Sequence, residues 1–117
     1  MIRDTIKNHS DFIAGGNDPT ARSAFFLVRA KPAKYPDDAR FGLIVTKKTF
    51  KHAVDRNRAK RLIRDWIAYN EKMMRDDWDY IFIDYQNKLG KGAEAIDSGR
   101  EAMRKALHYL RKQEINA

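Results

Sequence analysis

Hydrophobic residues recur at helical spacing through the middle of the chain, from about Ala53 to Met74. At about 100° per residue, one broad face collects the apolar side chains, namely Ala59, Leu62, Ile63, Trp66, Ile67, Met73 and Met74. The stripe roughly opposite is polar and basic, and consists of Asn57, Lys60, Arg61 and Arg64. This pattern predicts an amphipathic helix that packs on one side and is basic on the other.

Three shorter apolar segments have the composition of strands: Ser23–Arg29, Phe41–Thr46 and Tyr80–Tyr85. Aromatic and β-branched residues suit a pleated, half-buried surface. Because neighbouring strand residues point to opposite faces, Phe25 and Phe26 are expected on opposite sides of the first strand.

The ends of the chain favour helices. Ser10 or Asp11 could cap a short helix that carries Phe12 and Ile13 and ends at Gly15-Gly16. Ser98-Gly99-Arg100-Glu101 has the spacing of a capping box before a second amphipathic run. The order helix, strands, helix, strand, helix predicts an α/β (α+β) two-layer sandwich with a small sheet.

Length and composition narrow the class of protein. The 117 residues fit one domain, residues 1–117. The chain has no cysteine, which excludes disulfides and zinc–thiolate sites and fits a reducing compartment. No apolar run approaches the ~18 residues of a membrane span, and the N-terminus has no apolar signal region. We therefore expect a cytoplasmic protein without a membrane partner.

Charge is concentrated in Lys47–Arg64. This segment has eight cations and one anion, a net charge of +7, against +8 for the whole chain. The cations are Lys47, Lys48, Lys51, Arg56, Arg58, Lys60, Arg61 and Arg64. Such a concentration indicates one surface that faces a polyanion.

A solvated helix face is the alternative interpretation of this run. However, most of its cations lack the carboxylate at i,i+4 that a merely solvated helix uses, so they repel one another without a ligand. Guanidinium groups match phosphate oxygens two at a time, and Asn57 adds a group that can read a base edge or a hydroxyl. The sequence favours a nucleic-acid interface.

Other candidate chemistry is weaker. The three histidines have no metal-ligand spacing and no adjacent nucleophile, and no glycine-rich phosphate loop is present. Asp76, Asp77, Asp79 and Asp84 could hold a magnesium ion, or could be turn and solubility residues. Phe12, Phe25 and Phe26 could stack on unpaired bases, or could belong to the core.

Two sequence blocks resemble the protein component of bacterial ribonuclease P. One is Arg56-Asn57-Arg58-Ala59-Lys60-Arg61, preceded by Ala53-Val54-Asp55 and followed by Arg64-Asp65. The other, Arg40-Phe41-Gly42-Leu43-Ile44-Val45-Thr46-Lys47-Lys48, is similar to the family's strand and lysine pair, at the expected separation.

The resemblance implies a fold and a role. The family is an α/β sandwich whose arginine-rich helix lies in a left-handed βαβ crossover. Its members bind a catalytic RNA subunit, and the holoenzyme removes the 5′ leader of precursor tRNA. The RNA carries out the hydrolysis with Mg²⁺, so the protein alone is expected to be inactive and to bind no cofactor, metal or small-molecule substrate.

The same resemblance implies roles for particular residues. RNA-subunit contacts fall on Lys47, Lys48, Arg56, Asn57, Arg58, Lys60, Arg61 and Arg64. Leader-binding aromatics fall on Phe12 and on Phe25 or Phe26. The chain departs from the family pattern where Gly15-Gly16 replaces a second N-terminal aromatic, which implies a shallower leader cleft.

Two competing functions stay open. One is a general binding module for structured RNA, the ribosome or DNA. The other is an autonomous metal-dependent nuclease that uses Asp76, Asp79 and Asp84.

Overall fold

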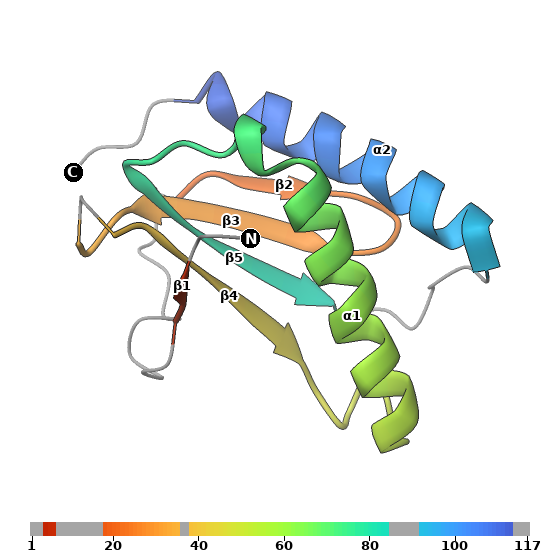
Figure 1. Cartoon of the computed structure of the whole chain (residues 1–117). Coiled ribbons are helices and arrows are strands. Elements are labelled where there is room, and N and C mark those ends of the chain that lie inside the picture. The colour runs from red at the N-terminus through yellow and green to blue at the C-terminus, as the bar shows by residue number, and fades with distance from the viewer. Residues whose placement is uncertain (1–3, 7–17, 36–37, 85–91, 114–117) are drawn as a thin grey trace.

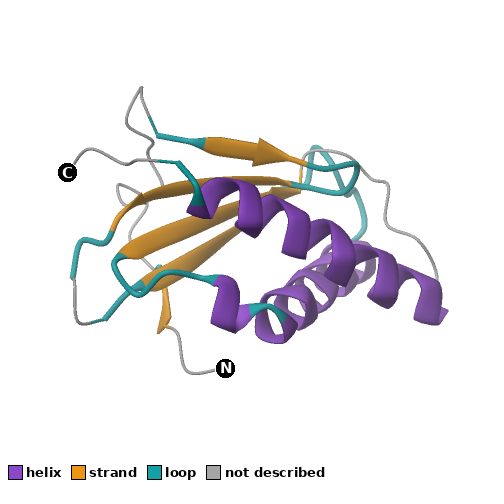
Figure 2. Cartoon of the chain, turned by 90° about the horizontal axis from the view of Figure 1, so that it is seen from above, coloured by secondary structure: helices purple, strands orange, loops and turns teal. Residues whose placement is uncertain are grey.

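The computed structural model describes residues 4–6, 18–35, 38–84 and 92–113. In chain order the elements are β1 (Asp4–Thr5), β2 (Thr20–Arg22), β3 (Leu27–Pro32), β4 (Arg40–Val45), α1 (Ala53–Tyr69), a 3-10 turn η2 (Glu71–Met73), β5 (Trp78–Asp84) and α2 (Gly92–Arg111). The strands form one sheet in the order β1-β4-β5-β3-β2 (Figure 1). Both helices lie on the same face of that sheet (Figure 2), so the predicted two-layer α+β sandwich is confirmed.

The connection from β4 through α1 to β5 has an unusual hand. β4 and β5 are parallel neighbours, and α1 crosses between them on the helix side of the sheet. Viewed from that side with both strands pointing upward, β5 lies to the left of β4 (Figure 1). The crossover is therefore left-handed, the exception to a rule that nearly all βαβ units obey.

The core lies between the sheet and the helices. Val28 of β3, Phe82 of β5 and Phe41 of β4 all face the helical layer and are at most 1% exposed. α1 contributes Ile63 and Trp66, as its apolar periodicity predicts. Alternation along each strand sends the intervening residues to the other side, which we call the far face of the sheet.

The prediction of a strand over Ser23–Arg29 is wrong for the N-terminal half of that segment. Phe25 and Phe26 lie in the turn between β2 and β3 rather than in a strand. The Ser23 hydroxyl accepts hydrogen bonds from the backbone N–H of both phenylalanines, at 3.1 Å each, and the Ser23 N–H donates to the Phe26 carbonyl at 2.9 Å. A serine that organises a tight turn locally competes with an extended strand.

Two helix boundaries also differ from the prediction. α1 ends at Tyr69, because Asn70 turns back and donates its side-chain amide to the carbonyls of Trp66 and Arg100, each at 3.0 Å. α2 begins at Gly92, six residues before the predicted capping box, so Ser98 lies inside the helix. The predicted N-terminal helix with Phe12 and Ile13 falls outside the described residues.

Among the described residues, no helix has the length and hydrophobicity needed to cross a membrane.

Candidate nucleic-acid interface

One side of α1 and the turn before it form a continuous polar surface. Along α1, Asn57, Arg61 and Arg64 are exposed and Lys60 is half-buried, whereas Ala59 and Ile63 on the opposite side are fully buried. We define the basic face as Lys47, Lys48, Asn57, Lys60, Arg61 and Arg64. The predicted division of α1 into an apolar and a basic side is confirmed.

Lys47 and Lys48 of the basic face lie on a compact turn between β4 and α1. The Phe50 N–H donates to the Thr46 carbonyl at 3.0 Å, which closes the turn around Lys47 and Lys48. The Phe50 side chain is only 1% exposed, so it anchors the turn in the protein. Both lysines are exposed and are held at the N-terminal end of the helix that carries the arginines.

Arg56 differs in position from the cations of the basic face. It is partly buried, and its Nη1 donates to the carbonyls of Phe50 and Lys51 at 3.0 and 3.2 Å. These bonds fix the turn against the first turns of α1. Arg56 therefore stabilises the turn next to the basic face. Arg58 is also half-buried rather than exposed.

The orientation of α1 is fixed by contacts with α2. Asp65 accepts two hydrogen bonds from Arg100 of α2, at 3.0 and 3.1 Å, and this pairing raises the pKa of Arg100. The Arg100 guanidinium also lies 4.4 Å above the Tyr69 ring. A helix tied in this way presents its basic side at a constant angle.

No described residue forms an ion pair with a cation of the basic face. Over the described parts of the chain, ion pairs join Arg40 to Asp79, Arg75 to Asp77, Arg100 to Asp65 and Arg104 to Glu101. None of these pairs includes a cation of the basic face. Exposed, mutually repelling charges on a rigid scaffold form an electrostatic surface suited to a sugar-phosphate backbone.

The aromatic residues divide between core and surface. Phe26 is fully buried, and its ring centroid lies 5.8 Å from that of Trp66, so it offers no surface to a base. Phe25 is half-buried and packs on the same tryptophan at 5.8 Å. The core interpretation holds for Phe26, and Phe12 lies outside the described residues.

The far face carries residues that sequence reasoning missed. β3 directs Leu27, Arg29 and Lys31 to this face, because the intervening Val28 and Ala30 point into the core. The sequence signal for these residues is the alternation of side-chain direction along Leu27–Pro32. The prediction missed it because the predicted strand, Ser23–Arg29, ends three residues before the observed one. Arg29 is half-buried and adds a positive charge to the far face.

The aspartates do not form a cluster. Asp79 is fully buried, accepts the Arg40 N–H at 2.7 Å and pairs with the Arg40 guanidinium at 3.2 Å. Asp84 follows five residues later on β5, which places it about 17 Å away along the strand and on the opposite face. Within the described residues no three His, Asp or Glu side chains come together as candidate metal ligands.

Comparison with known proteins assigns the family. The ribonuclease P sequence model matches residues 3–111. The chain belongs to the ribonuclease P protein family. The predicted resemblance is thereby confirmed, and tRNA processing is the process to which this family belongs.

Relatives of the ribonuclease P family agree in sequence and in fold. A ribonuclease P protein component from a Marinomonas species is 38% identical, over 92% of this chain and 89% of that protein. One from Chromobacterium violaceum is 46% identical, but the match covers 50% of this chain and only 47% of that protein's length. A solved Staphylococcus aureus RNase P protein, a mutant with defective mRNA degradation activity, has the same fold, with a TM-score of 0.71 and 23% identity over 92% of this chain and 87% of that one.

Proposed function

We propose that this chain is the protein subunit of a ribonuclease P ribonucleoprotein, and that its basic face binds the catalytic RNA subunit. The observation that carries the proposal is the set of exposed cations on α1 and the preceding turn, none of which is in an ion pair with a described residue. Family membership supports RNA as the polyanion. The docked helix would track a phosphate backbone, and Asn57 would add a contact to a base edge or a ribose hydroxyl.

The 5′ leader of precursor tRNA would lie on the far face of the sheet. Arg29 on β3 is half-buried and supplies a cation there. Phe12 lies outside the described residues and stays a predicted leader-binding aromatic. Single strands bind such surfaces through backbone charge and base stacking, without strong sequence preference.

Hydrolysis would belong to the RNA with its Mg²⁺, and the protein would act by binding. Two aspartates support this assignment of hydrolysis to the RNA. Asp79 on β5 and Asp77 just before β5 each form an ion pair with an arginine. The protein alone is therefore expected to leave RNA intact. Cleavage by the purified protein that is abolished by Asp84→Asn would instead support the nuclease alternative.

The test is processing of precursor tRNA by a bacterial ribonuclease P RNA at low Mg²⁺, with and without the protein. We expect stimulation that requires the RNA subunit. Arg61→Gln combined with Arg64→Gln should lower the slope of log affinity against log salt by about 1.4–1.8, or 0.7–0.9 for each lost phosphate contact.

Lys72→Gln is the matched control, since Lys72 is an exposed cation on η2 outside the basic face. It should leave both processing and the salt slope unchanged. Tight, salt-sensitive RNA binding without any stimulation would refute the subunit role and leave a general structured-RNA or ribosome-associated binding module.

A further inference from the structure

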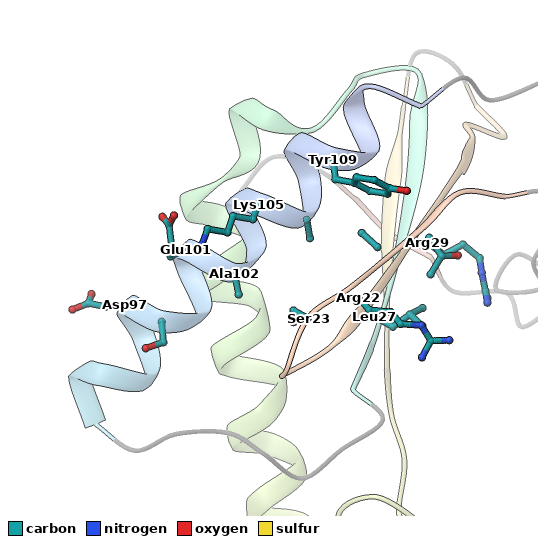
Figure 3. Close-up of a pocket in the computed structure, with 13 residues that line it drawn as sticks. Arg22, Ser23, Leu27, Arg29, Asp97, Glu101, Ala102, Lys105 and Tyr109 are labelled. Carbon is teal, nitrogen blue, oxygen red and sulfur yellow. The ribbon is translucent and has the colours of Figure 1, made fainter.

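A second groove lies at the other side of the molecule, between α2 and the β2–β3 hairpin. Its volume is about 1090 Å³, and residues of both elements line it (Figure 3). β2 is the last strand of the sheet on this side, whereas β4, which leads into the basic face, lies two strands beyond β3. The groove is therefore separate from the basic face.

Small residues create the hollow. Ala21 of β2 faces Ala102 and Ala106 of α2, which are one helical turn apart, and these three side chains line the groove on the helix side of the sheet. Leu27 and Arg29, which point to the far face, also line the groove. Alanines on both elements leave space that larger side chains would fill. The lining between β2 and α2 is thus apolar at its centre.

The rim is cationic and aromatic. Arg22 and Arg29 project from the strands, and neither is in an ion pair with another described residue. Tyr109 is 53% exposed and extends from α2 toward the side on which both arginines lie (Figure 3). Asp97 and Glu101 lie toward the other end of the groove.

The acidic end is partly neutralised. Glu101 accepts two hydrogen bonds from Arg104, at 2.6 and 3.0 Å, which lower the pKa of Glu101 and keep it charged but paired. Lys105, which also lines the groove, adds a further positive charge beside it. The groove consequently has a cationic, aromatic end and no net negative charge to repel phosphate.

We propose that this groove binds single-stranded RNA, with one base stacked on Tyr109 above the apolar lining and the adjoining phosphates held by Arg22 and Lys105. An exposed aromatic ring beside unpaired cations is the combination that sequence-tolerant single-strand binding uses. The main alternative is an extended peptide added to the edge strand β2. Unpaired arginines and the projecting tyrosine favour RNA, because peptide addition to a strand edge needs neither.

The test measures binding of a fluorescent oligouridylate to the full chain after Lys60→Gln, Arg61→Gln and Arg64→Gln have removed most charge from the basic face. We expect residual binding that Tyr109→Ala weakens by about 5- to 150-fold, the range of one lost stacking contact. Tyr109→Phe should retain it, because the ring remains. Arg22→Gln with Lys105→Gln should lower the salt slope by about 1.4, while Lys72→Gln leaves it unchanged.

Three results would overturn the proposal: no residual binding in the basic-face variant, equal affinities for Tyr109→Ala and Lys72→Gln, or equal losses for Tyr109→Phe and Tyr109→Ala. A groove that takes a peptide along β2 would give the second result. Precursor tRNA processing is not the readout, so failure here leaves the proposed subunit role untouched. Circular dichroism of each variant separates lost binding from lost folding.

Discussion

Gly99 in α2 sits against the face of Trp66, and its replacement by alanine tests how α1 is seated. An added Cβ would lie 1.8 Å from Trp66 Cε2, 2.1 Å from Cζ2 and 2.2 Å from Nε1. Trp66 is 1% exposed, and the rings of Phe25 and Phe26 also pack against it, so the indole has no free space into which to move. Relief therefore requires the two helices to separate.

The sign of the change in the free energy of unfolding on Gly99→Ala shows whether packing or helix propensity dominates. Alanine in a helix interior is better than glycine by about 1 kcal/mol. Overpacking a core costs about 1–3 kcal/mol, and an overlap with a rigid ring belongs at the upper end. We expect Gly99→Ala to lower the free energy of unfolding by about 2 kcal/mol net, with a fall in Tm of roughly 8 °C.

Urea denaturation followed by circular dichroism measures this change. Ser98→Ala is the matched control, because Ser98 is the exposed neighbour in the same helix and its substitution should change stability by less than about 0.5 kcal/mol. The Gly99→Ala penalty should shrink in a Trp66→Leu background, where the clashing ring atoms are gone. A Gly99→Ala protein as stable as the wild type would refute the reasoning.

Three further predictions concern charged side chains. Arg56→Ala should weaken RNA-subunit binding while leaving the salt slope almost unchanged, since its guanidinium bonds backbone carbonyls rather than phosphate; a slope lower by about 0.7–0.9 would contradict this. Asp79→Asn should destabilise the fold by about 3–5 kcal/mol in urea denaturation, because it leaves the buried Arg40 guanidinium without its carboxylate; a loss under 1 kcal/mol would show that the pair is dispensable. The hydrogen bond from Arg75 lowers the pKa of Asp77, so the stability from this pair is present above the unfolded pKa near 3.8 and is lost as the pH falls through the lower folded value. Because both groups are exposed, Asp77→Asn should cost at most about 1 kcal/mol at pH 6 and nothing near pH 2, and an equal cost at both pH values would refute the assignment.

The sequence by itself determined α1 and its two sides. Ile63 is buried and Arg64 is exposed because a period of 3.6 residues fixes which side chains share a face, whatever the helix packs against. The basic face followed from the same periodicity and from the local excess of cations. The two-layer fold followed from the order of elements, and the family from residues within one continuous segment, Arg40–Asp65.

Only the tertiary structure decided which residues lie opposite one another. Asp79 looked like a turn residue or a metal ligand, but its partner Arg40 is 39 positions away in the chain. Gly99 looked like part of a capping box, and its actual role is to admit Trp66 from another helix. Phe26 was predicted to lie on a strand, but it lies in a turn in which its N–H donates to the Ser23 hydroxyl. Periodicity reports the direction of a side chain relative to its own element, whereas these outcomes depend on packing between elements that are distant in sequence.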